Sequence, residues 1–139
     1  GIGRARFYAK HLGCQIAIID KRRTDANVSE VMNVVGDVKD KNVIIVDDIV
    51  DTAGTLCNAA YALKQNGAKD IYACCTHPVL SDNAYKKIEE SVIKELVVSD
   101  TIPLRNESPK IKVLSVANMF AQAIYHIHIE KPLGELFLE

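Results

Sequence analysis

The sequence has little of what marks membrane proteins, nucleic-acid-binding proteins or disulfide-stabilised proteins. No apolar stretch approaches the roughly 20 residues of a membrane helix, and the net charge of the 139 residues is only −1. The four cysteines fit no disulfide framework, and the opening GIGRARFYAKHLG is typical of a basic amphipathic helix rather than a signal peptide. We therefore expect a cytoplasmic protein that binds neither nucleic acid nor a membrane.

Three potential metal ligands, Cys74, Cys75 and His77, lie close together in the sequence YACCTH. On a strand only Cys75 and His77 share a face. The sequence has no second pair of cysteines to complete four zinc ligands. We interpret these residues as strand positions and assign no metal ligand to this chain.

Strand-like and helix-like segments alternate along the whole chain. Helices are expected over residues 3–12, 55–66, 83–91 (capped by Ser81) and from Ser115 onward, and strands over 15–19, 32–35, 43–46, 71–76, 95–98 and 112–114. The β-branched run VIIV at 43–46 is typical of a strand buried on both faces, as in a parallel sheet. The pattern predicts one α/β domain over residues 1–139, with three layers and a mostly parallel sheet of about five strands.

Two adjacent carboxylates, Asp47 and Asp48, follow this buried strand. In open α/β sheets, ligands bind beyond the carboxyl ends of the strands. Two carboxylates at such a position need partners, because each loses hydration there. Ribose hydroxyls or a divalent cation would supply them.

The next segment, DTAGT at residues 51–55, turns from the strand into a helix. Thr52 and Thr55 offer hydroxyl donors, Gly54 permits an unusual backbone conformation, and the helix start offers free N–H groups and a positive dipole end. These properties predict an anion site suited to a phosphate. A solvated strand end followed by an ordinary cap is the alternative, but the complete string is more specific than either half.

The string VIIVDDIVDTAGT resembles the phosphoribosyl-binding motif of the type I phosphoribosyltransferase fold. Over its whole length the chain also resembles the C-terminal domain of ribose-phosphate pyrophosphokinases, which are also called phosphoribosyl pyrophosphate synthetases. The stretches that carry this resemblance are GIGRARFYAKHLG, DKRR, VMNVVGDV, VIIVDDIVDTAGT, NGAKDIYACCTHPVLS, IKELVVSDTIP and the last helix followed by ELF.

The resemblance implies an Mg²⁺-dependent transfer of the diphosphoryl group of ATP to the 1-hydroxyl of ribose 5-phosphate. Lys21 and Arg23, in DKRR, would act on the reacting groups from a loop that folds over them, with Arg23 also contacting ribose 5-phosphate. Without the resemblance, KRR is an ordinary solvated charge run. The sugar hydroxyls would bind Asp47, assisted by Asp48 through a hydroxyl or Mg²⁺-bound water. The 5-phosphate would be held by Asp51, Thr52, Ala53, Gly54 and Thr55.

Members of this family have two tandem domains, and the resemblance covers only the second. The absent first domain would supply much of the ATP site and the Mg²⁺ ligands, and no P-loop is present here. We therefore expect the chain to bind ribose 5-phosphate but to be inactive alone. The resemblance also implies homo-oligomers, with hexamers built from dimers. The alternatives are a small phosphoribosyltransferase and a non-catalytic associated or regulatory subunit.

Overall fold

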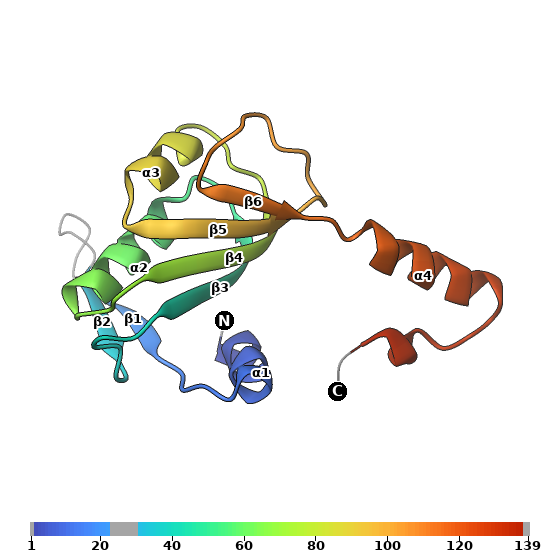
Figure 1. Cartoon of the computed structure of the whole chain (residues 1–139), viewed down its shortest axis with the longest axis horizontal. Helices are drawn as coiled ribbons and strands as arrows, with labels where there is room; N and C mark the ends of the chain where they lie inside the picture. Colours follow the sequence, from blue (N-terminus) through green and yellow to red (C-terminus); the bar gives the residue numbers. More distant parts are fainter. Residues whose placement is uncertain (1, 23–30, 138–139) are drawn as a thin grey trace.

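The computed structural model describes residues 2–22 and 31–137 (Figure 1). Helices and strands alternate along most of the chain, as the sequence predicts. In chain order the elements are α1 (Ile2–Leu12), β1 (Ile18–Arg22), β2 (Val31–Val35), β3 (Val43–Val50), α2 (Gly54–Gln65), β4 (Ile71–Pro78), α3 (Ala84–Glu90), β5 (Ile93–Ser99), β6 (Ile111–Leu114), α4 (Ala117–His128) and the 3-10 helix η1 (Leu133–Leu136).

The main sheet has the strand order β3-β4-β5-β6, and all of its neighbouring strands run parallel. Its registers pair Val46 with Cys74 and Cys75 with Val98. Strands β1 and β2 form a separate antiparallel pair. The predicted α/β class, with a mostly parallel sheet flanked by helices, is confirmed.

The core lies between this sheet and helices α2 and α3, which cover one of its faces (Figure 1). Alternate strand residues point into it, because successive side chains of a strand face opposite ways. The fully buried large side chains are Leu63, Ile71, Ile88, Ile93, Leu96, Val98 and Pro78. On the opposite face of β3, Ile44 is 53% exposed. The core therefore anchors the carboxyl end of β3, where the candidate site begins.

Two predicted strands differ from the observed ones by three residues or more at an end. The strand predicted over 15–19 lies at Ile18–Arg22, because the antiparallel ladder with β2 continues through Lys21 and Arg22. The strand predicted over 43–46 extends to Val50, because its parallel ladder with β4 continues past the acidic pair.

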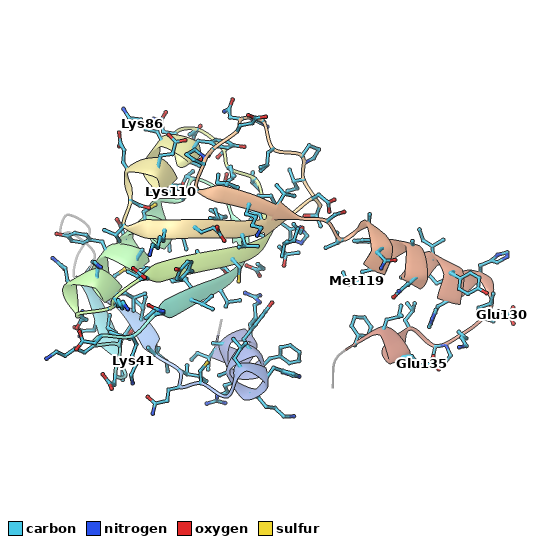
Figure 2. All side chains as sticks on the ribbon, in the orientation of Figure 1. Lys41, Lys86, Lys110, Met119, Glu130 and Glu135 are labelled. Atoms are coloured by element: carbon cyan, nitrogen blue, oxygen red, sulfur yellow. The ribbon has the colours of Figure 1, made fainter. Side chains whose placement is uncertain are left out.

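Helix α4 projects away from the body of the molecule (Figure 1), and none of its residues is buried. Figure 2 shows Met119 on α4, well apart from Lys110 at the start of β6. At the base of α4, the Val116 N–H donates to the Asp100 carboxylate at 2.9 Å. The Ser115 hydroxyl and this N–H lower the pKa of Asp100. Within the described part of the chain, no helix is both long enough and apolar enough to cross a membrane.

Candidate functional site

A pocket of about 250 Å³ opens where β3 passes into α2. It is lined by Asp47, Ile49, Val50, Asp51, Thr52, Ala53, Gly54, Thr55 and Leu56. Residues 51–55, which the sequence predicts to hold a phosphate, are called the phosphate loop below. The structure thus brings the whole phosphate loop and Asp47 to one pocket. Asp48 lies next to the pocket in β3 but does not line it.

The entry into α2 is made by a left-handed residue. Ala53 is the N-cap, with φ 59° and ψ 1°, and no side chain caps the helix. The first backbone bond of α2 runs from the Cys57 N–H to the Ala53 carbonyl at 3.0 Å. The helix start therefore faces the pocket with its positive dipole end and without a side-chain cap of its own.

Gly54 does not use the unusual backbone conformation that a glycine permits. Gly54 is the first residue of α2, whereas Ala53 has the positive φ. A Cβ added at Gly54 would meet only the Thr52 Oγ1, at 4.0 Å. Packing within the chain therefore does not demand glycine at position 54.

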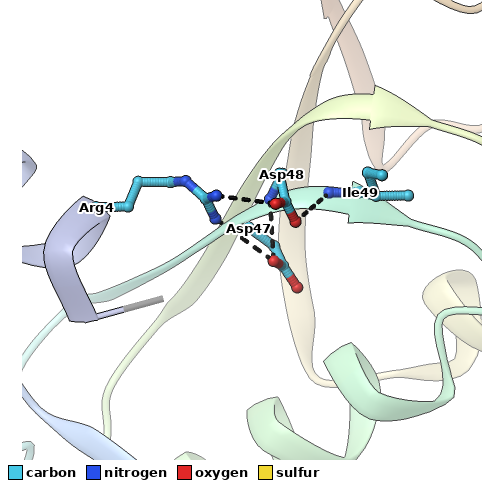
Figure 3. A network of polar contacts seen from close by, with 4 residues as sticks. All are labelled: Arg4, Asp47, Asp48 and Ile49. Carbon is cyan, nitrogen blue, oxygen red and sulfur yellow. Dashed lines mark hydrogen bonds and ion pairs between the residues drawn. The ribbon is translucent and has the colours of Figure 1, made fainter.

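The two carboxylates of β3 share one guanidinium (Figure 3). Arg4 of α1 lies 3.0 Å from the Asp48 Oδ2 and 3.6 Å from the Asp47 Oδ1. The Asp48 N–H donates to the Asp47 Oδ1, and the Ile49 N–H to the Asp48 Oδ1, both at 2.9 Å. Hydrogen bonding to Asp47, and then to Arg4, lowers the pKa of the Asp48 carboxyl. Arg4 is a site residue that the sequence reasoning missed.

Removing this guanidinium should raise the pKa of Asp48 in the folded chain. The pKa of Asp48 in the folded chain is below the ordinary value of 3.8. The Arg4–Asp48 pair therefore stabilises the fold at pH values above 3.8, and this stabilisation is lost as the pH falls through the folded pKa. In Arg4→Gln the Asp48 carboxyl should titrate at higher pH, as measured by carbon-13 NMR of the side-chain carboxyls. Arg6→Gln on the same helix is the control, and an unchanged Asp48 titration in Arg4→Gln would contradict the assignment.

The serine that was predicted to cap α3 instead contacts the phosphate loop. The N-cap of α3 is Asn83, without a side-chain capping bond. The Ser81 hydroxyl donates to the Asp51 carboxylate, 30 residues away in the sequence. The predicted Ser81 cap is therefore wrong, because the hydroxyl is used in this tertiary contact.

The side chains of the two predicted catalytic cations, Lys21 and Arg23, lie outside what the structure describes. The backbone of Lys21 lies in β1, in register with Met32, and not in the loop that the resemblance implies for it. Arg23 lies outside the described residues. The roles assigned to Lys21 and Arg23 stay predictions.

The donor set of the pocket does not fit a divalent cation held by this chain alone. Within residues 2–22 and 31–137, no three His, Cys, Asp or Glu side chains are grouped to hold a metal ion. Arg4 pairs with both Asp47 and Asp48 and offsets one of their two negative charges. Burial raises the pKa of the Cys75 thiol to about 11, and this cysteine is not among the residues that line the pocket.

Comparisons with known proteins identify the family. The family described as "Phosphoribosyl synthetase-associated domain" matches residues 22–138. The chain is 58% identical over 138 residues to a ribose-phosphate pyrophosphokinase of Campylobacter jejuni, covering 99% of this chain and 45% of that protein. For a ribose-phosphate pyrophosphokinase of Caldanaerobacter subterraneus the identity is 56%, over 98% of this chain and 44% of that protein.

A solved structure gives the same result. The phosphoribosylpyrophosphate synthetase of Mycobacterium smegmatis superposes with a TM-score of 0.83 at 36% identity, covering 92% of this chain and 43% of that one. The chain thus spans less than half the length of the relatives that it matches. On the family match and these identities, the chain belongs to the phosphoribosyl synthetase-associated domain family.

Proposed function

We propose that the chain is the sugar-phosphate-binding part of a ribose-phosphate pyrophosphokinase, an enzyme that transfers the diphosphoryl group of ATP to the 1-hydroxyl of ribose 5-phosphate. The observation that carries the proposal is the pocket between β3 and α2, where a carboxylate and a helix start without a side-chain cap face the same space. The names of the relatives support the reaction. The product, phosphoribosyl pyrophosphate, would feed nucleotide synthesis.

In this proposal the two ends of the ligand meet opposite kinds of partner. The 5-phosphate binds at the start of α2, where backbone N–H groups and the helix dipole favour an anion. The hydroxyls of the sugar donate to the Asp47 carboxylate, which lines the same pocket. This separation keeps the carboxylate away from the phosphate, and it sets the direction in which the sugar lies.

The donor half of the reaction would use two residues of this chain together with parts of the parent enzyme outside it. Lys21 and Arg23 would act on the transferred group, where cations offset developing negative charge. Mg²⁺ would neutralise the phosphates of ATP when bound. Because no three potential metal ligands are grouped among the described residues, and because Arg4 occupies both carboxylates of the acidic pair, we expect the Mg²⁺ ligands to come from substrate phosphates and from protein outside this chain. The parent enzyme is proposed to be a cytoplasmic homo-oligomer.

Calorimetric titration of the chain with ribose 5-phosphate tests the proposal. Binding should be saturable and should weaken at least tenfold for ribose without its phosphate, because charge-assisted hydrogen bonds are lost. Asp47→Asn should weaken ribose 5-phosphate binding by roughly tenfold on the same argument. Glu89→Gln, an exposed substitution on α3, is the control and should bind as the parent chain does.

Three results would count against the proposal. Absence of ribose 5-phosphate binding would favour a non-catalytic subunit. Binding of a nucleobase together with phosphoribosyl pyrophosphate would favour a phosphoribosyltransferase. Formation of phosphoribosyl pyrophosphate from ATP by the 139-residue chain alone would contradict its expected inactivity.

A further inference from the structure

Three consecutive carbonyl groups at the pocket are held by one neighbouring segment. The donors are the Leu80 N–H to the Val50 carbonyl, the Ser81 N–H to the Asp51 carbonyl and the Lys87 Nζ to the Thr52 carbonyl, each at 3.1 Å. Leu80, Ser81 and Lys87 are called the bracket below. They come from the β4–α3 connection and from α3, about 30 residues beyond the phosphate loop in the sequence. The bracket therefore ties the loop to the body of the fold.

Anchored carbonyls determine where the adjoining N–H groups point. In a trans peptide the C=O and N–H bonds are directed oppositely across the peptide plane, and no described peptide bond is cis. With the carbonyls of Val50, Asp51 and Thr52 turned to the bracket, the N–H groups of Asp51, Thr52 and Ala53 are directed the other way. Residues 51–53 line the pocket, whereas among the described residues that line it none belongs to the bracket. These N–H groups are thus aimed at the pocket, as in a backbone anion nest.

The bracket also turns a negative charge away from the anion site. The Asp51 carboxylate accepts a hydrogen bond from the Ser81 hydroxyl, so it faces the bracket instead of a phosphate that it would repel. Two residues of this connection, Leu80 and Asp82, have positive φ angles of 47° and 51°. Such conformations cost energy for non-glycine residues and persist where surrounding contacts enforce them. The hydrogen bonds to the loop are such contacts.

We propose that Ser81 and Lys87 are positioning residues for phosphate binding, acting through the phosphate loop rather than on the ligand. Ser81 orients Asp51, whose role becomes structural rather than phosphate-contacting. Lys87 aims the Ala53 N–H into the pocket by holding the Thr52 carbonyl. This inference rests on the proposed function, because it concerns how the same pocket recognises the 5-phosphate.

Lys87→Met tests the inference, with Lys87→Arg as the conservative variant and Lys86→Met as the matched control. Lys86 is the adjacent lysine of α3 (Figure 2), paired with Glu90 at 3.9 Å. In Lys87→Met the dissociation constants for ribose 5-phosphate and for inorganic phosphate should each rise about fivefold, the effect of one net hydrogen bond. Lys87→Arg and Lys86→Met should bind as the parent chain does. The affinity for unphosphorylated ribose should not change in any variant.

A second measurement needs no ligand. In the free protein, the amide resonance of Ala53 in proton–nitrogen NMR should shift in Lys87→Met and stay in place in Lys86→Met. If the parent chain binds ribose 5-phosphate and Lys87→Met binds it equally well, the inference is overturned and the proposed function stands. If the parent chain binds neither ribose 5-phosphate nor inorganic phosphate, the proposed function fails. The Ala53 resonance then decides the inference, and an unshifted resonance in Lys87→Met overturns it.

Discussion

The Ala53→Val protein should unfold with a free energy about 3 kcal/mol lower than that of the parent chain. Ala53 has φ 59° and is only 4% exposed. A β-branched side chain in this left-handed conformation collides with its own backbone, and two further methyl groups would overpack a closed site. Urea denaturation followed by circular dichroism measures the loss. Because the strain falls on the N-cap residue of α2, ribose 5-phosphate binding should be lost as well.

Ala53→Gly separates conformation from packing. Glycine adopts positive φ without steric cost but gains freedom in the unfolded chain, and the two effects nearly cancel. Its unfolding free energy should therefore stay within about 1 kcal/mol of the parent value. Equal stabilities of the valine and parent proteins would show that position 53 is neither left-handed nor enclosed.

Leu96→Ala should remove about 2–5 kcal/mol of unfolding free energy. Leu96 lies in the central strand β5, is 0% exposed and belongs to the core cluster beneath α2 and α3. Deleting its isobutyl group loses the transfer free energy and leaves a cavity. Strand β5 cannot move to close this cavity, because it is paired with β4 on one side and β6 on the other. Urea denaturation measures the loss, provided that the slope of unfolding free energy against urea concentration stays constant. A change of this slope would report a change in the unfolded or folded ensemble instead.

Ile44→Ala provides the comparison on the same sheet. Ile44 is 53% exposed on β3, so a comparable loss of carbon atoms removes far less buried area. Its effect should be less than half that of Leu96→Ala. Similar losses of unfolding free energy in the two proteins would mean that the face of β3 carrying Ile44 is covered in solution. The core would then not be confined to the α2–α3 side of the sheet.

The order and type of the elements follow from local pattern, which is why the sequence predicts them well. The run at 43–46 is β-branched, and the stop of α2 is marked by Gly67, which has φ 89° beside Lys39. Element ends are predicted less well because they depend on partners. The acidic pair suggests that β3 ends at Val46, yet the ladder with β4 keeps Asp47 and Ile49 in register with Cys75 and His77.

The residues that line the pocket were predicted from a contiguous string of sequence. The residues that hold them in place from distant parts of the chain could not be predicted in this way. Asp47 and residues 51–55 are adjacent in sequence, and a strand-to-helix turn brings them together without long-range information. Arg4, Ser81 and Lys87 reach the site from 44, 30 and 35 residues away. Their types are ordinary for surface helices and turns, so only the tertiary fold distinguishes them from solvated charges. The left-handed Ala53 escaped prediction for a similar reason, since alanine gives no local signal for positive φ.

We expect the projecting helix α4 to melt separately from the sheet domain. It has 12 residues, none of them buried, and isolated helices of this length are marginal in water. Its backbone hydrogen bonds can therefore open without disturbing the sheet, and its amide protons exchange by local opening rather than by global unfolding. The two-state assumption holds for the sheet domain but not for the whole chain, so helical content and core stability are separate quantities in this protein.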